Sequence, residues 1–199
     1  MKTKKNIITA NKGPLAIAFS SLIEKANYNN VILKYSAAVG GGTPILEFGR
    51  KCLEADRILE INAILNGTTN YILTEMDNRG LSFNDALNEA QKLGYAESDP
   101  TLDIDGFDAA AKLVIMGNLL LNKDLVLNDL SVKGIRDITQ KDISKAKDNG
   151  NTIKLIASIN KSAKVNPIEI SRDDPMCVKG ALNSVKFTTT FAGEEIIIG

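Results

Sequence analysis

The sequence predicts an α+β fold in which a mixed, largely open β-sheet is covered on one face by helices. Two observations support this fold class. The front of the chain alternates between strand-like and helical segments, whereas the part after residue 130 is mostly strand-like with a single helix. With 199 residues and 44% apolar side chains, the chain is long enough for one domain with a sizeable core.

The first forty residues predict half of an α/β unit. Residues 6–10 are typical of a short buried strand, and the turn at 11–14 places Pro14 at the N1 position of a helix. Apolar residues at helical spacing predict a helix over 15–26, and a long strand is expected over 30–39. One such crossover does not make a nucleotide-binding domain.

A run of three glycines, Gly40-Gly41-Gly42, ends this strand. The run lacks the spacing of a dinucleotide-binding fingerprint and of a P-loop. We therefore favour a tight turn after which Pro44 opens a helix over 45–55. The alternative that the glycines let the backbone approach a ligand or an ion stays open.

In the rest of the chain, capping residues mark where the predicted helices begin and end. Asn66-Gly67-Thr68-Thr69 supplies a turn and a helix N-cap, and Ser82 caps the next helix. Gly80 and Gly94 are typical residues for the ends of these two helices. In order, the segments predicted are a strand at 59–65, helices at 70–78, 83–93 and 107–121, a strand at 130–136, a helix at 140–148, and strands at 152–160, 164–171, 183–190 and 194–198.

Charge and composition exclude several classes of protein. Lys plus Arg and Asp plus Glu both total 24, so no net charge favours a nucleic acid or an anionic membrane as partner. The absence of histidine excludes Ser-His-Asp and Cys-His hydrolases and the usual zinc sites. No apolar run approaches the roughly 20 residues of a membrane span. Cys52 and Cys177 are too few and too far apart for a disulfide framework, so we expect a cytoplasmic protein with reduced thiols.

The stretch 94–112 concentrates acidic residues ahead of an apolar helix. Its charged side chains are Glu97, Asp99, Asp103, Asp105, Asp108 and, at its end, Lys112. An EF-hand calcium loop would fit Asp103-Ile104-Asp105-Gly106, but Lys112 then stands where a bidentate glutamate is required. This excludes the EF-hand interpretation.

Two interpretations of this stretch stay open from the residues alone. In the first, Asp105 is the N-cap of the helix, Asp108 lies at N3, and Asp108 and Lys112 form an ordinary i,i+4 pair. In the second, the stretch is a catalytic carboxylate-lysine site. Apolar neighbours would disfavour the charge of Lys112 while Asp108 would support it, which suits a group that exchanges a proton.

The order of residues here carries a family resemblance. The string Gly94-Tyr95-x-Glu97-x-Asp99-Pro100-x-x-Asp103-x-x-Gly106-x-Asp108-x-x-x-Lys112 resembles the signature of homoserine dehydrogenases, NAD(P)-dependent enzymes that interconvert L-aspartate 4-semialdehyde and L-homoserine. Three further stretches are similar to the same family in the same order: Thr9–Lys12, Ala38–Ile45 and Asn66–Leu73.

The resemblance implies a role for each matched residue. Lys112 would give a proton to the alkoxide formed by hydride transfer, with Asp108 beside it, and Lys12 would act near both cofactor and substrate. The implied substrate-binding residues are Glu97, Asp103, Asp108, Lys112 and Thr43. The implied cofactor-binding residues are Lys12 and Gly94. The carbonyl groups of Val39, Gly41 and Thr43 would match the family's monovalent-cation site, whose usual glutamate is replaced by Ser36.

The resemblance also implies an organisation. Residues 1–30 would be a remnant of a Rossmann-like nucleotide-binding domain, and residues 31–199 the catalytic and dimerisation domain. NAD or NADP would be bound mainly by sequence outside this chain, so the chain alone would be inactive. The partner would be a second copy, joined through the sheet, and the reaction would serve threonine and methionine biosynthesis. The alternatives are a non-catalytic assembly module and a metal-binding protein built on the acidic stretch.

Overall fold

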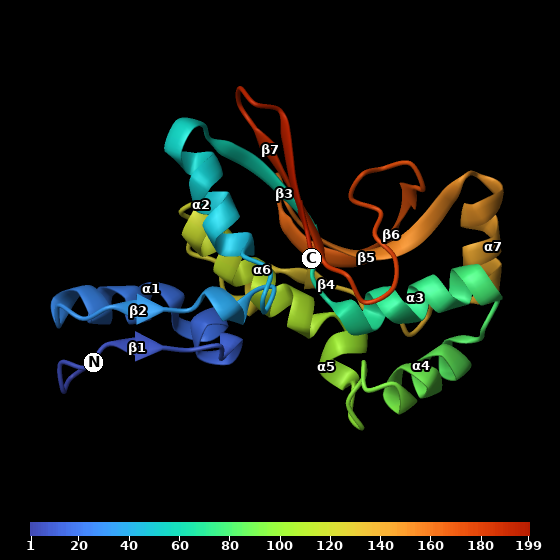
Figure 1. The fold of residues 1–199 in the computed structure, drawn as a ribbon, viewed down its shortest axis with the longest axis horizontal. Coiled ribbons are helices and arrows are strands. Elements are labelled where there is room, and N and C mark those ends of the chain that lie inside the picture. Colours follow the sequence, from blue (N-terminus) through green and yellow to red (C-terminus); the bar gives the residue numbers. More distant parts are fainter.

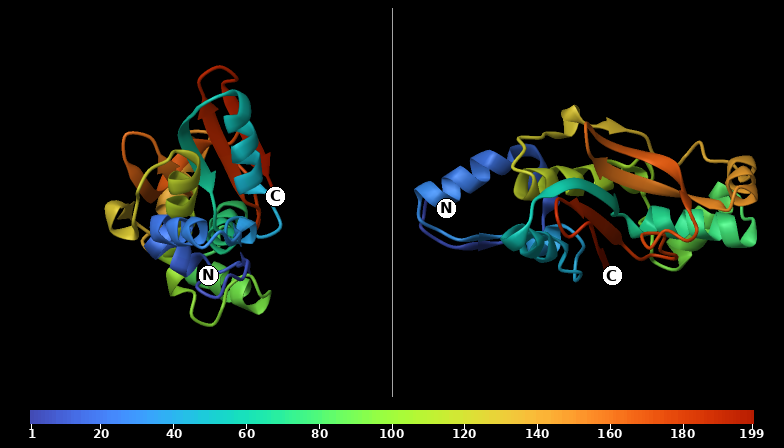
Figure 2. Two further views of the ribbon diagram at one scale, coloured as in Figure 1. Left: turned by 90° about the vertical axis from the view of Figure 1, so that its left-hand side faces the viewer. Right: turned by 90° about the horizontal axis from the view of Figure 1, so that it is seen from above.

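The computed structural model describes all 199 residues, and it contains two sheets of unequal size. The smaller sheet pairs β1 (Ile7–Ile8) with β2 (Leu33–Lys34) in parallel, and α1 (Lys12–Tyr28) connects them. This β1-α1-β2 unit extends from one end of the molecule in Figure 1 and in the right-hand view of Figure 2. It is the α/β unit predicted for the front of the chain.

The larger sheet has six strands in the order β4-β6-β5-β3-β7-β8. Its strands are β3 (Ile58–Ile64), β4 (Ser131–Val132), β5 (Asn151–Ile159), β6 (Ala163–Ser171), β7 (Ser184–Thr189) and β8 (Glu194–Ile198). The β4-β6 pair is parallel, and every other pair is antiparallel. The predicted mixed, open sheet is therefore confirmed.

Helices cover the outer side of this curved sheet (Figure 1). The helices packed on the sheet are α2 (Ile45–Ala55), α3 (Gly67–Arg79), α6 (Phe107–Leu120) and α7 (Gln140–Asp148). Two more, α4 (Phe83–Lys92) and α5 (Thr101–Ile104), pack on α3 and α6 rather than on the sheet. One hydrophobic core of 40 buried residues joins the helices to the sheet, and it takes every second residue of β5, such as Leu155 and Ala157. None of the helices combines the length and the apolar composition needed to span a bilayer.

The loop between β6 and β7 lies on the inner side of the sheet (Figure 1). Met176 and Val178 of this loop form a second, small core with Ile64 and Ile156. Strand β5 also contacts α3 through Lys154, whose ammonium donates hydrogen bonds to Asn70 Oδ1 and Thr74 Oγ1. The fold thus places α3 between the acidic stretch and the inner side of the sheet.

The structure corrects the predicted start of the first helix. The helix begins at Lys12 rather than at residue 15, and the Asn11 side chain caps it by accepting from Gly13 N at 3.1 Å. Pro14 therefore lies in the third helical position instead of N1, where its missing N–H still costs no hydrogen bond.

The predicted strand over 30–39 is mostly wrong. Only Leu33–Lys34 is strand, and Ser36–Ala38 forms a 3₁₀ turn. Asn30 has a positive φ of 51°, which excludes it from a strand. Tyr35 is buried with its ring edge-to-face on Phe19 at 5.7 Å, so packing on α1 ends the extended segment early.

The predicted strand over 130–136 is also too long, and the predicted N-cap of α6 is wrong. Strand β4 ends at Val132, after which Gly134 lies against the Ile104 carbonyl group of α5. The N-cap position of α6 is Gly106, with φ of 88°, and Asp108 is accordingly at N2. Asp105 instead forms an ion pair with Arg136.

Candidate active site

The amino-terminal end of α6 brings two lysines onto one carboxylate. Lys12 Nζ lies 3.0 Å from Asp108 Oδ1, and Lys112 Nζ lies 2.7 Å from Asp108 Oδ2. Asp108 is buried, with 8% of its side chain exposed, whereas Lys12 at the start of α1 is 40% exposed. The two lysines come from distant parts of the sequence, and Asp108 fixes the distance between them.

Asp108 is held in its ionised form. Burial by itself would raise the pKa of the Asp108 carboxyl group, but the Lys112 ammonium, the Asn66 amide and Lys12 together hold that pKa below its ordinary value. The carboxylate is therefore a fixed negative charge near neutral pH. A proton exchanged at this site would have to be carried by another group.

Lys112 is oriented by two acceptors. Its Nζ donates to the Leu65 carbonyl oxygen at 2.7 Å and pairs with Asp108, and 17% of its side chain is exposed. An ammonium has three N–H groups, so one donor remains for a further partner. The side chain is held in place by these two contacts and has one N–H donor left for a further partner.

Asn66 both caps α3 and hydrogen-bonds to two of the acidic residues, and the sequence predicts only the cap. Its Oδ1 accepts from Thr69 N at 2.8 Å and so caps α3, as predicted. Its Nδ2 donates to Asp103 Oδ1 at 2.7 Å and to Asp108 Oδ2 at 2.9 Å. An asparagine cap, unlike serine or aspartate, leaves an amide free to bind carboxylates, and this is the signal that could have located it.

Replacing Asn66 by aspartate is expected to lower the free energy of unfolding by on the order of 3 kcal/mol, because its hydrogen bonds to the buried Asp108 and the partly buried Asp103 become repulsions. Aspartate is as good an N-cap as asparagine, so the cap itself is retained. The difference in stability should narrow as the pH falls towards about 4, because the introduced aspartate, placed next to two carboxylates, would take up a proton and lose its charge.

Urea unfolding at several pH values would measure this difference. The matched control is Asn66→Ser, which keeps the cap and adds no charge, and should cost less. An Asn66→Asp protein as stable as the wild type at neutral pH would contradict the assigned contacts.

Two adjoining cavities open beside this network. The first has a volume of about 130 Å³ and is lined by Lys12, Glu97, Asp99, Leu102, Asp103 and Asp108. The second, of about 320 Å³, is mostly apolar and is lined by Asn11, Lys12, Gly13, Ala16, Ile17, Leu102, Phe107, Asp108, Ala111 and Leu127. The acidic cavity suits a small molecule with an ammonium group, and the apolar cavity suits a flat ring beside it.

Most residues predicted for the site lie together, and some do not. Lys12, Glu97, Asp103, Asp108 and Lys112 belong to the first cavity or to the network behind it. Two others lie apart. Gly94, with φ of 79°, lies in open space after α4, and the Thr43 side chain is next to Gly199.

The carbonyl groups predicted to bind a cation lie in the turn before α2. One of them, that of Thr43, accepts from Ile45 N at 2.8 Å. Ser36 contacts one oxygen of Glu47 on α2, and the other oxygen, Glu47 Oε2, is buried without a partner.

The sequence and fold match one family of known proteins. Residues 44–199 match the family described as homoserine dehydrogenase. The homoserine dehydrogenase of Methanocaldococcus jannaschii is 46% identical over 199 residues, which are all of this chain and 59% of that protein. The NAD(+)-dependent homoserine dehydrogenase of Pseudomonas canavaninivorans is 39% identical over 202 residues, covering 98% of this chain and 57% of that protein.

Solved structures of homoserine dehydrogenases also superpose on this chain. A putative homoserine dehydrogenase from Archaeoglobus fulgidus superposes with a TM-score of 0.95 at 39% identity, covering 100% of this chain and 62% of that one. A hyperthermophilic archaeal homoserine dehydrogenase in complex with NADPH superposes with a TM-score of 0.85 at 32% identity, covering 98% of this chain and 57% of that one. The chain thus spans less than two thirds of the length of these relatives.

Proposed function

The chain belongs to the homoserine dehydrogenase family, and from this premise we propose that it forms the substrate-binding and catalytic part of an NAD(P)-dependent homoserine dehydrogenase. The reaction is the interconversion of L-homoserine and L-aspartate 4-semialdehyde. The observation that carries the proposal is the Lys12-Asp108-Lys112 network at the edge of an acid-lined cavity.

The acidic cavity would bind the amino-acid end of the substrate. Glu97 and Asp103 line it, and their carboxylates suit the α-ammonium group. Lys12, which also lines it, is the cation available to the substrate carboxylate. These contacts would direct the side-chain oxygen of homoserine towards Lys112, whose third donor is available.

Lys112 would move the proton. In the direction of aldehyde reduction its ammonium gives a proton to the oxygen that becomes a hydroxyl group, and in the reverse direction it takes that proton back. Asp108 and the Leu65 carbonyl hold Nζ in one place during this exchange.

The apolar cavity fits the nicotinamide ring but not a whole dinucleotide, because about 320 Å³ is at the lower end of ligand-sized pockets. NAD(P), when bound, supplies or takes up the hydride. Phe107, Ala111 and Leu127 would exclude water from one side of the ring. Gly94 and Lys12 stay our proposed cofactor contacts, and the rest of NAD or NADP would be bound outside this chain, with residues 1–30 as part of the nucleotide-binding region.

We propose that carbonyl groups of Val39, Gly41 and Thr43 bind a monovalent cation, and the unpaired Glu47 Oε2 supports a cation nearby. We propose a homodimer through the inner side of the sheet, where Ile168 and Ile198 are exposed. A cytoplasmic enzyme of threonine and methionine biosynthesis is in keeping with two free cysteines.

Calorimetric titration with L-homoserine tests the function. We expect binding that weakens at least about tenfold for 4-hydroxybutanoate, which lacks the ammonium group that Glu97 and Asp103 would hold. L-2-Aminobutyrate, which lacks the hydroxyl group, is the matched control and should keep most of the affinity. The titration is repeated with a nucleotide-binding domain and NAD(P) present. Absence of homoserine binding under both conditions would falsify the proposal.

A further inference from the structure

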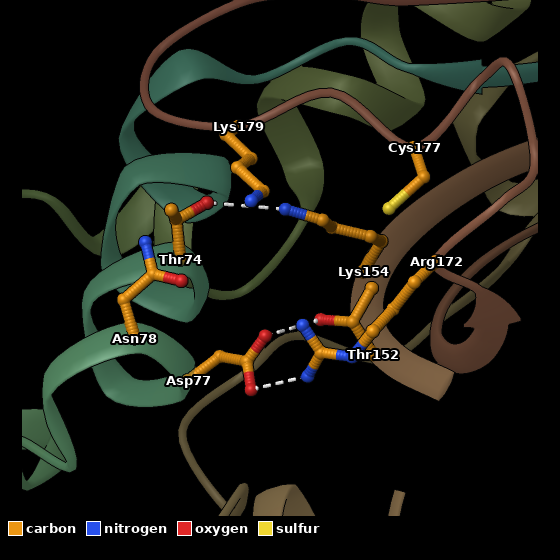
Figure 3. Close-up of a pocket in the computed structure, with 8 residues that line it drawn as sticks. All are labelled: Thr74, Asp77, Asn78, Thr152, Lys154, Arg172, Cys177 and Lys179. Atoms are coloured by element: carbon orange, nitrogen blue, oxygen red, sulfur yellow. Dashed lines mark hydrogen bonds and ion pairs between the residues drawn. The ribbon is translucent and has the colours of Figure 1, made fainter. Parts of the chain in front are cut away.

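A second polar cavity lies beside the carboxyl-terminal half of α3 (Figure 3). The acidic residues contact the opposite, amino-terminal end of this helix through Asn66. It has a volume of about 90 Å³ and is lined by Thr74, Asp77, Asn78, Thr152, Lys154, Arg172, Cys177 and Lys179. These residues come from α3, from β5 and from the segment after β6. The cavity shares no lining residue with the two cavities of the candidate active site.

Cationic side chains outnumber carboxylates around this cavity. Lys154, Arg172 and Lys179 line it against one acidic residue, Asp77. The carboxylate of Asp77 is already engaged, because Arg172 Nη2 lies 2.6 Å from Oδ1 and Thr152 Oγ1 donates to Oδ2 at 3.1 Å. The charge of Arg172 is therefore balanced, and the charges of the two lysines are not.

Lys154 is a buried cation without a counterion. Only 2% of its surface is exposed, and it forms no ion pair. Its ammonium donates to two neutral acceptors, Asn70 Oδ1 at 2.7 Å and Thr74 Oγ1 at 3.1 Å, and one of its three donors is left over. Burying an unpaired ammonium is costly, so the site favours an anion within reach of Nζ.

We propose that this cavity binds a small tetrahedral oxyanion of the inorganic phosphate class. Lys154 would be its buried contact at the base, and the exposed Lys179 its contact at the rim. A volume of about 90 Å³ is several times the roughly 10–15 Å³ that one water molecule requires, and it is far below the roughly 300 Å³ of pockets for larger ligands. The size therefore selects an ion and excludes a nucleotide.

The protonation of Lys154 agrees with this assignment. Burial lowers the pKa of Lys154 to about 8, and nearby Cys177 and Asp77 oppose that decrease. The ammonium is still the main form near neutral pH, so the cavity carries a net positive charge under those conditions.

Thermal unfolding with and without inorganic phosphate tests the proposal. At constant ionic strength and neutral pH, phosphate at about ten times its Kd is expected to raise the Tm by roughly 3–5 °C, with chloride as the reference anion. Lys154→Met should remove this phosphate-dependent shift, whatever its own Tm. Lys161→Met, which removes an exposed lysine in the β5-β6 turn, is the matched control and should keep the shift.

The exposed position of Lys179 provides a second variant that does not disturb the core. Lys179→Gln should fold normally and show a weaker phosphate response. Two results would overturn the proposal. One is the absence of a phosphate-specific shift in the wild type, which is also the result expected if a carboxylate of a second copy occupies the cavity. The other is an equal shift in the wild type and in both cavity variants, which would place the ion elsewhere.

Discussion

Replacing Lys112 by alanine is expected to lower the kcat of homoserine oxidation by about 100- to 10,000-fold, the range that general acid-base groups supply. The reason is geometric: Lys112 Nζ is held by Asp108 and the Leu65 carbonyl at 2.7 Å from each, with one donor left for the substrate oxygen. The measurement is steady-state turnover with NAD(P) and a nucleotide-binding domain present. The KM for homoserine should change less than kcat, since Glu97 and Asp103 would still hold the amino-acid end.

Lys112→Arg separates proton transfer from charge. Arginine keeps a cation beside Asp108, so the buried carboxylate stays paired and the Tm should stay near that of the wild type. Arginine does not release its proton in proteins, so kcat should be as low as in the alanine variant. Near-normal turnover of Lys112→Ala would exclude the catalytic role, and recovery of turnover by arginine would reduce that role to electrostatics.

Much of the fold could be predicted from local signals. Helix α7 has the predicted bounds 140–148, and α4 begins after Ser82 and is followed by Gly94 in the left-handed region, because caps act within a few residues of sequence. The strands predicted over 30–39 and 130–136 are longer than the observed ones, because contacts between residues far apart in the sequence end these strands early. Tyr35 packs on Phe19 and Gly134 packs on Ile104, and such distant contacts leave no local pattern.

In the candidate site too, local contacts could be predicted from the sequence and long-range contacts could not. The spacing of Asp108 and Lys112 is a helical i,i+4 relation and was visible in the sequence. The convergence of Lys12 on the same carboxylate depends on how α1 packs against α6, and residue types alone do not contain that information. Asn66 and its two carboxylate partners are likewise 37 and 42 positions apart. The family resemblance placed Lys12 near the substrate and the cofactor, but its contact with Asp108 and the contacts of Asn66 with the two carboxylates come from the structure alone.

A second large effect is expected at Gly134, where the acidic stretch rests on the segment after β4. An added Cβ would lie 2.1 Å from the Ile104 carbonyl oxygen and 2.4 Å from Asp105 Cα, both of them backbone atoms that cannot rotate away. The Ile104 carbonyl also accepts from Ile135 N at 2.8 Å, so it is fixed from the same side. Gly134→Ala is therefore expected to lower the free energy of unfolding by about 3 kcal/mol, which corresponds to a decrease in Tm of roughly 6–12 °C.

The same substitution should weaken homoserine binding, because any displacement of Ile104 moves the neighbouring Asp103 away from Asn66 and from the acidic cavity. The matched control is Gly42→Ala, since a Cβ at Gly42 meets nothing within 4 Å and its φ is not positive. Calorimetric unfolding and homoserine titration of both variants check the two effects together. If Gly134→Ala is as stable as Gly42→Ala, the contact between the β4 segment and α5 does not hold the acidic stretch in place. If it is destabilised but binds homoserine normally, Asp103 is positioned without help from this contact, by the hydrogen bonds that Asn66 Nδ2 donates to its Oδ1 and Thr68 Oγ1 donates to its Oδ2.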